Sequence, residues 1–220
     1  MQHVVWDWNG TLLNDLQQVV LSVNAALAPL GAGPITADDY RAGYTRPVVL
    51  FYEHLLGRPV SDDEWRQLDI TFHEAYRVAL ADAELAPDAL AAVDLVNEAG
   101  WTQSLLSMFP HNELLVALEE HGVGGHMLAI DGLRSGRGER KYGSLVRHLE
   151  NVAPKLGGRI DPTTVVMIGD ALDDADAADG LGIKCVLYAS GSHPRHMLEA
   201  SGHPVADSLV EALALGGVTT

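Results

Sequence analysis

The stretch HVVWDWNGTLLND, residues 3 to 15, decides the predicted fold of this 220-residue chain. A short apolar run ends abruptly in Asp7, and Asn9, Gly10 and Thr11 follow at once. An apolar run that stops at polar residues and a glycine is typical of a buried strand that opens into a turn. We therefore predict a buried strand whose carboxyl end presents Asp7 to a site, with backbone N–H groups of the turn around it.

Later apolar runs have the same character, and they cover residues 101–108, 126–131, 164–170 and 183–190. Stretches with helical spacing of leucine and valine, closed by glycines, lie between the later runs. Strands that alternate with helices predict an α/β fold with a Rossmann-like parallel sheet that has helices on both faces. Ligands of such sheets bind beyond the carboxyl ends of the strands. The polar residues that close the runs are expected to converge there: Asp7, Ser107, Asp131 and Asp170.

The connection between the first two predicted strands is unusually long, at more than ninety residues. Its sequence carries several helical patterns, the first of which Asn14 can cap. We therefore predict a small all-helical insertion after strand 1, at residues 14–83. The rest of the chain, residues 1–13 and 84–220, is predicted to form the Rossmann-like core.

The composition argues against two classes of partner. The chain has 14 basic and 30 acidic residues, a formal charge of −16 and a pI near 4.8, so a general attraction to nucleic acid or to an anionic membrane is not expected. The single cysteine, Cys185, allows no internal disulfide. The first residues lack the basic lead and apolar run of a signal peptide. We expect a cytoplasmic location, and the oligomeric state stays open.

Acidic residues gather again in MIGDALDDAD, residues 167 to 176. Asp170 closes a predicted strand, and Asp173 and Asp174 fall on the opening turn of a predicted helix. Carboxylates that face each other from separate strand ends repel unless a cation lies between them. Because these ligands offer oxygen alone, and the histidines show no metal-binding spacing, we predict Mg²⁺ as the cofactor.

Two further residues suit an anionic ligand. Ser107 ends the second predicted strand and can donate a hydrogen bond. Lys141, one of only three lysines in the chain, can supply local positive charge.

Four segments together resemble the haloacid dehalogenase-like hydrolases, most of which are magnesium-dependent phosphatases. VVWDWNGTLL (residues 4–13) resembles the first motif of that family, a strand followed by D-x-D-G-T-L, and LLSMFP (105–110) resembles the second. ERKYG (139–143) stands where the third motif places a lysine, and VVMIGDALDDADAADGLGI (165–183) resembles the fourth. The helical insertion resembles the cap of the subgroup that includes phosphoglycolate phosphatase-like enzymes.

The resemblance implies that Asp7 is the nucleophile, which takes the phosphoryl group as an aspartyl-phosphate. Lys141 would offset the charge of Asp7. The residues expected to bind phosphate or substrate are Gly10, Thr11, Ser107, Met108, Lys141 and, in the cap, Arg46. Those expected to hold magnesium are Asp7, Asn9, Asp170 and Asp174. The expected substrate is a small phosphorylated metabolite.

Asn9 departs from the motif. The phosphatases of the family have an Asp here that protonates the leaving oxygen and then activates water, while its backbone carbonyl binds the metal. Asn keeps the carbonyl but exchanges no proton, so acid–base catalysis should be weaker by about 10² to 10⁴. Three explanations stay open: a leaving group that needs no proton, transfer of the phosphoryl group to another acceptor, or binding without hydrolysis.

Rival interpretations can be weighed against the same residues. A phosphonatase of this family needs a cap lysine, and residues 1–140 contain no lysine. A metal-free dehalogenase would not need the acidic cluster around Asp170. We therefore expect a phosphatase whose catalytic residues are Asp7, Asn9 and Lys141. The serious alternative is a catalytically impaired phosphate-binding protein or a phosphotransferase that uses the same pocket.

Overall fold

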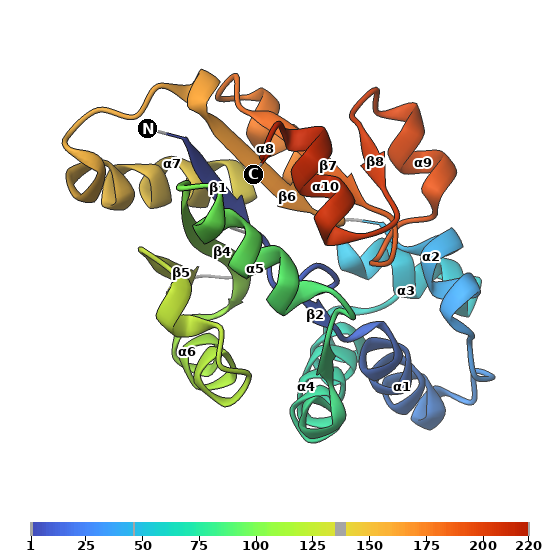
Figure 1. The fold of residues 1–220 in the computed structure, drawn as a ribbon. Coiled ribbons are helices and arrows are strands. Elements are labelled where there is room, and N and C mark those ends of the chain that lie inside the picture. The colour runs from blue at the N-terminus through green and yellow to red at the C-terminus, as the bar shows by residue number, and fades with distance from the viewer. Residues whose placement is uncertain (1, 46, 135–139, 220) are drawn as a thin grey trace.

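The computed structural model describes residues 2–45, 47–134 and 140–219. Within these ranges, six parallel strands form the main sheet in the order β5, β4, β1, β6, β7, β8 (Figure 1). In that order their bounds are Ile130–Leu133, Thr102–Pro110, His3–Trp6, Val165–Gly169, Lys184–Tyr188 and Val205–Ala206. The predicted α/β class with a Rossmann-like parallel sheet is confirmed.

Strand β1 lies in the middle of the sheet, with β4 on one side and β6 on the other. All four of its residues are buried. Val4 and Trp6 pack into the core on one face of the sheet, whereas Val5 packs into the core on the other. A strand covered on both faces needs apolar residues in both alternating positions, which is why its sequence is a continuous apolar run.

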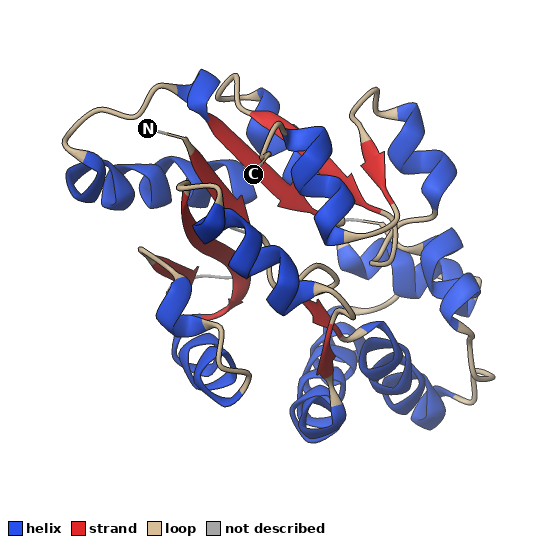
Figure 2. Cartoon of the chain, viewed as in Figure 1, coloured by secondary structure: helices blue, strands red, loops and turns tan. Residues whose placement is uncertain are grey.

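Two layers of helices cover the sheet (Figure 2). The core of one face includes residues of α5 (Ala89–Glu98), α6 (His111–Glu120) and α10 (Leu209–Gly216). The core of the other face includes residues of α7 (Lys141–Val152), α8 (Leu172–Asp179) and α9 (Arg195–Ala200). Helix α8 begins directly after the carboxyl end of β6, and Lys141 at the start of α7 contacts Asp7 at the end of β1. Both helices thus begin near the carboxyl ends of the strands, where we predicted the site.

The described residues between β1 and α5 form four α-helices that do not pack on the sheet core: α1 (Leu16–Leu27), α2 (Ala37–Gly43), α3 (Val48–Leu56) and α4 (Asp62–Ala79). They enclose a hydrophobic core of their own. A short antiparallel pair, β2 (Leu13–Asn14) with β3 (Glu84–Leu85), joins this helical segment to the sheet. The cap boundaries at residues 14–83 stay a prediction. Arg46 lies outside the described residues.

One predicted strand begins later than the sequence indicated. Residues 126–131 were expected to be extended, but Gly124–His126 form a 3₁₀ turn and β5 starts only at Ile130. Asp131 therefore lies near the start of its strand instead of at the carboxyl end. Its carboxylate pairs with the Nδ1 atom of His148 at 2.8 Å, so it does not join the other strand-end residues.

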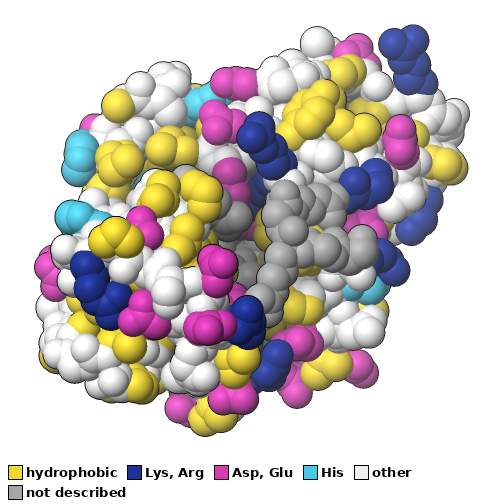
Figure 3. Space-filling view, turned by 180° about the vertical axis from the view of Figure 1, so that it is seen from behind, with side chains coloured by type: hydrophobic (Ala, Val, Ile, Leu, Met, Phe, Trp, Pro, Cys, Tyr) yellow, Lys and Arg dark blue, Asp and Glu magenta, His cyan; other side chains and the backbone are white. Residues whose placement is uncertain are grey.

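One face of the molecule shows how its charged side chains are distributed (Figure 3). Among the described residues on the face seen in Figure 3, Lys and Arg side chains are interspersed with Asp and Glu and form no single basic patch. No helix in the described ranges is long and apolar enough to cross a membrane.

A buried chain of polar side chains ties the sheet to helix α7. The ring of His3 bonds to the hydroxyl groups of Thr102 and Ser104, each at 2.7 Å. The Ser104 hydroxyl also contacts the Nε2 atom of His148 at 2.7 Å, and His148 pairs with Asp131. The Ser104, His148 and Asp131 side chains resemble a catalytic triad, but Ser104 and His148 are fully buried. We therefore interpret the chain as a structural network that positions α7.

The structure predicts a pH-dependent stability that comes from His3. Burial, and then the neighbouring His148, lower the pKa of His3 to about 4. Because the unfolded side chain has a pKa of about 6.5, unfolding takes up a proton between about pH 6.5 and 4. Stability should therefore fall as pH falls through this window, by up to about 1.4 kcal/mol per pH unit.

Urea denaturation of wild type and of His3→Gln, at several pH values between 4 and 7, measures this contribution. The variant should lose less stability than wild type over the window. His196→Gln, at an exposed position of α9, is the control and should follow wild type. Parallel curves for wild type and His3→Gln would contradict the assignment.

Candidate active site

Four charged side chains meet at the carboxyl edge of the sheet. Asp7 follows β1, Asp170 follows β6, Asp174 lies in the first turn of α8, and Lys141 begins α7. The Nζ atom of Lys141 lies 2.7 Å from Oδ1 of Asp7 and also forms an ion pair with Asp174. Each of the three carboxylates offers an oxygen within 4.8 Å of the others. The structure thus brings together the charged residues that we predicted from separate motifs.

Burial dominates the electrostatics of this cluster, since all four side chains are at most 6% exposed. Burial raises the pKa of Asp7 to about 6, although Lys141 opposes the rise. Burial also raises the pKa of Asp170 and of Asp174 to about 7, with further repulsion from neighbouring carboxylates. Burial opposes the charge on Lys141, but Asp174 and Asp7 raise its pKa above the ordinary value. One ammonium therefore faces three crowded carboxylates.

The donor set fits a hard divalent cation. Carboxylate oxygens at this spacing are ligands that Mg²⁺ prefers, and a cation would relieve the repulsion that raises their pKa values. Asp170 is held in place for such a role, because the backbone N–H and the hydroxyl of Ser192 donate to its Oδ2 at 2.6 and 2.7 Å. Asp174 is held as well, since its Oδ2 accepts the N–H of Ala171 at 3.0 Å.

Three glycines, Gly10, Gly169 and Gly191, lie so close to the carboxylates of Asp170 and Asp174 that a Cβ atom on any of them would overlap. Gly10 has a φ of +72° in the turn after β1, and a Cβ atom there would lie 2.5 Å from Oδ2 of Asp170. A Cβ atom on Gly169 would overlap the carboxylate of Asp174. Gly10 therefore serves both the left-handed turn and the packing against Asp170, whereas Gly169 serves packing alone.

Asn9 is held by side chains from two directions. Its Nδ2 atom donates to Oδ2 of Asp15 at 3.0 Å and to the hydroxyl of Tyr76 at 2.8 Å. Its Oδ1 atom lies 3.4 Å from the hydroxyl of Ser107. Asp15 also accepts the N–H of Gly10 at 2.8 Å and the hydroxyl hydrogen of Tyr76.

Asp15 and Tyr76 are neighbours of the site that the sequence analysis missed. We expected Asn14 to cap the first helix, but α1 begins at Leu16 with Asp15 at the capping position and without a side-chain cap bond. The carboxylate of Asp15 is turned back toward the motif instead. The sequence around an acidic residue that precedes a helix does not indicate which way its carboxylate points. Tyr76 lies 61 positions farther along the chain, so its contact with Asp15 could not be predicted either.

The remaining predicted residues lie on the same turns. Ser107 is buried at the end of the regular part of β4, accepts the N–H of Phe109 at 3.1 Å, and is followed by the half-buried Met108. Thr11 is fully buried, and its hydroxyl has no hydrogen-bond partner in the described part of the chain. The roles that the resemblance assigned to these residues stay predictions.

The helical segment also touches the loop that holds Asp170. The guanidinium of Arg41, on α2, donates to the backbone carbonyls of Ser190 and Gly191 at 2.9 and 3.0 Å. The ring of Tyr44 packs against that of His193. These contacts join residues about 150 positions apart, so no local sequence pattern predicts them.

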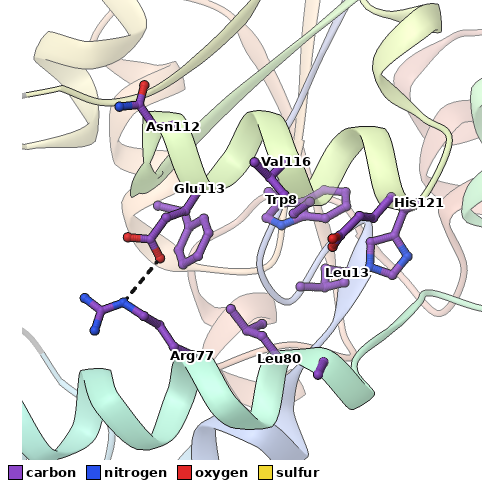
Figure 4. A pocket seen from close by; sticks show the side chains of 12 residues that line it. Trp8, Leu13, Arg77, Leu80, Asn112, Glu113, Val116 and His121 are labelled. Atoms are coloured by element: carbon purple, nitrogen blue, oxygen red, sulfur yellow. Dashed lines mark ion pairs between the residues drawn. The ribbon is translucent and has the colours of Figure 1, made fainter.

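A separate pocket of about 460 Å³ lies between α4 and α6 (Figure 4). Its walls are largely apolar and include Trp8, Leu13 and Phe109, and the ion pair between Arg77 and Glu113 spans 3.6 Å across it. Phe109 contacts the ring of Tyr76. The pocket therefore borders the Asn9 side of the site without containing its carboxylates.

We predict that Gly169→Ala destabilises the protein by about 1–3 kcal/mol, the usual cost of overpacking a core. The added methyl group would overlap Asp174, which also holds the N–H of Ala171. Urea denaturation measures the change. Gly33→Ala, where a Cβ atom meets open space, is the control and should leave the stability nearly unchanged. Equal stability of Gly169→Ala and wild type would show that Asp174 is not packed as described.

Comparison with known proteins identifies the family. A family model described as haloacid dehalogenase-like hydrolase matches residues 1–182. The chain is 27% identical to a phosphoglycolate phosphatase of Cereibacter sphaeroides, over 92% of each chain. It is 22% identical to phosphoglycolate phosphatase 1 of Pseudomonas aeruginosa, over 96% of this chain and 78% of that one.

A solved structure has the same fold. A haloacid dehalogenase-like family hydrolase from Streptococcus pneumoniae superposes with a TM-score of 0.81, at 16% identity and over 97% of each chain. The predicted enzyme class, a hydrolase, is confirmed. The chain belongs to the haloacid dehalogenase-like hydrolase family.

Proposed function

We propose that this hydrolase is a magnesium-dependent phosphatase that acts on a small phosphorylated metabolite through an aspartyl-phosphate on Asp7. The observation that carries the proposal is the buried contact of 2.7 Å between Asp7 and Lys141, beside the carboxylates of Asp170 and Asp174. The named relatives support the substrate class, because their names place them among phosphoglycolate phosphatases.

The charges around Asp7 suit a nucleophilic carboxylate. An oxygen of Asp7 would attack phosphorus, and the bond from phosphorus to the leaving oxygen would break. Water would then release the phosphate and restore the carboxylate. Lys141 would hold the phosphoryl oxygens together with Ser107, so that catalysis consists mainly of positioning and of electrostatic stabilisation.

The metal would be held by Asp7, Asp170 and Asp174, and by the backbone carbonyl of Asn9. When bound, magnesium supplies positive charge that polarises a phosphoryl oxygen and offsets the surplus of carboxylates. The chain itself fixes these ligands, through Ser192 at Asp170 and through Ala171 at Asp174.

We propose that the helical segment, residues 14–83, acts as a cap that excludes water and selects the substrate. Its contacts with the core support this role, since Arg41 reaches the loop that holds Asp170 and Tyr76 reaches Asn9. The cytoplasmic location stays part of the proposal.

A second candidate function rests on Asn9. An amide at this position leaves the metal and phosphate ligands in place while it removes a proton carrier. A catalytically impaired phosphate-binding protein or sensor, or a phosphotransferase, could use the same pocket. An assay of phosphate release separates these functions from a phosphatase.

We predict phosphate release from phosphorylated metabolites or acetyl phosphate that requires both magnesium and Asp7. Freshly prepared protein should be mass-verified to retain Asn9, because an Asn-Gly sequence is prone to deamidation. Asp7→Asn should lower kcat by at least ~10³-fold, as loss of a catalytic nucleophile commonly does. Asp207→Asn, at an exposed position, should keep full activity. Wild-type turnover no greater than that of Asp7→Asn would favour the phosphate-binding protein or the phosphotransferase.

We also predict that magnesium stabilises the protein. A ligand that binds the folded state alone, at 100 times its Kd, adds about 2.7 kcal/mol to the free energy of unfolding. Thermal melting with and without Mg²⁺ should show a rise in Tm for wild type and none for Asp170→Asn. Sodium chloride at equal ionic strength controls for screening. A magnesium-induced rise that persists in Asp170→Asn would place the metal elsewhere.

A further inference from the structure

The orientation of the Asn9 amide is fixed by its neighbours. The hydroxyl of Tyr76 donates its hydrogen to Asp15, so the Tyr76 oxygen is left to accept from Asn9. Oδ2 of Asp15 is also an acceptor. Two acceptors on one side require the NH₂ group there, and Oδ1 of Asn9 must then face the hydroxyl of Ser107.

Asp15 itself is fully engaged by these contacts. Its Oδ1 accepts the N–H of Gly10, and its Oδ2 accepts from Asn9 and Tyr76. The side chain is 2% exposed, and Asn9 stands between it and Ser107. Asp15 is therefore a positioning residue, which acts through Asn9, and it offers no free oxygen to a substrate.

We propose that Asp15 and Tyr76 lock Asn9 with its carbonyl oxygen toward the phosphate site, and that the enzyme therefore acts on phosphates whose leaving group departs without a proton. Acyl phosphates and aryl phosphates with an acidic phenol belong to this class. The inference rests on the proposed phosphatase function. It develops one of the three explanations of Asn9, a leaving group that needs no proton, from the orientation of the Asn9 amide.

The reaction balances without a proton donor at position 9. When Asp7 attacks, the bond from phosphorus to the leaving oxygen breaks, and the leaving group carries away the electron pair as a carboxylate or phenolate. Water next attacks phosphorus, and the electron pair of the breaking bond returns to Asp7. The protons of this water end on the phosphate product, which leaves as dihydrogen phosphate. The Oδ1 atom of Asn9 can accept a hydrogen bond from the water and orient it without taking its proton.

The same contacts explain why an Asp does not simply fit here. In Asn9→Asp, a carboxylate oxygen would replace Nδ2 at 3.0 Å from Asp15, and attraction would become repulsion. In Asn9→Asp/Asp15→Asn, the new amide can accept from Gly10 and donate to the new carboxylate, and Tyr76 can donate to that carboxylate as well. The double exchange thus places the carboxyl group of the family's motif at position 9 and keeps a hydrogen bond at each of these contacts.

The first test is a leaving-group series with mass-verified protein. Wild type should hydrolyse p-nitrophenyl phosphate and acetyl phosphate about 10²- to 10⁴-fold faster, in kcat/KM, than phenyl phosphate and phosphoglycolate, since that factor is the usual contribution of a general acid. In Asn9→Asp/Asp15→Asn the difference between p-nitrophenyl and phenyl phosphate, which are similar in shape, should shrink at least ~10-fold.

The outcomes separate the inference from the proposed function. Asp7-dependent turnover that is equally fast on all four substrates would overturn the inference and leave the phosphatase standing. Asp7-dependent turnover of phosphoglycolate alone would also overturn the inference and leave the phosphatase standing, whereas no Asp7-dependent turnover of any of the four substrates would overturn both. An unchanged leaving-group dependence in the double variant would also overturn the inference.

The second test examines the positioning role. Asn9→Asp should lower Tm, and the added Asp15→Asn should restore it, whereas Asn112→Asp, an exposed position on α6, should change Tm little. Tyr76→Phe keeps the ring contacts with Phe72 and Phe109 and should lower kcat roughly 10-fold with KM nearly unchanged.

Tyr52→Phe, which removes a hydroxyl from another buried tyrosine of the helical segment, is the matched control and should keep kcat. An Asn9→Asp protein as stable as wild type, or equal kcat values for wild type and Tyr76→Phe, would overturn the lock.

Discussion

The ammonium group of Lys141, shared between Asp7 and Asp174, is the interaction on which the site depends. Burying a charge is costly unless it is paired, and this pairing joins the end of β1 to the first turns of α7 and α8. One lysine cannot neutralise three carboxylates, so Asp170 needs the two hydrogen bonds from Ser192. The fold thus supports a surplus of negative charge at one point, which the proposed magnesium ion would offset.

The helical segment is attached to this charged cluster at two places. On one side, Arg41 binds the carbonyls of Ser190 and Gly191, directly before the serine that holds Asp170. On the other side, Tyr76 binds Asn9 and Asp15. Both contacts end on the backbone or the side chains of the site. A movement of the helical segment would therefore shift the loop that holds Asp170 and the side chain of Asn9. The position of the helical segment and the geometry of the site are therefore physically coupled.

The sequence was sufficient for five of the six described strands of the main sheet, because apolar runs reveal buried strands and strand ends reveal Asp7, Ser107 and Asp170, but the two-residue strand β8 was not predicted. The roles of Lys141 and Asp174 came from the resemblance to the family. The sequence was insufficient where long-range packing decides. The carboxylate of Asp131, a residue level with Leu106 in the sheet, bonds to His148 of α7. The carboxylate of Asp15 turns back to Gly10 instead of capping α1. Such contacts depend on how segments distant in the sequence pack together, and the periodicity of apolar residues does not predict this packing.

The contacts of Asn9 also show what is gained when the motif's acid is absent. An Asp at position 9 would add a fourth carboxylate beside a cluster that has one lysine, and an incoming phosphate would meet that charge directly. In this chain the carboxylate stands at Asp15, where Gly10 and Tyr76 bind it behind the amide. The phosphate is then met by a neutral carbonyl, so repulsion of the anion is weaker while proton transfer is lost. Under the proposed function, such a site would favour binding of the phosphate over protonation of its leaving group, and chemistry that needs little protonation would suit it best.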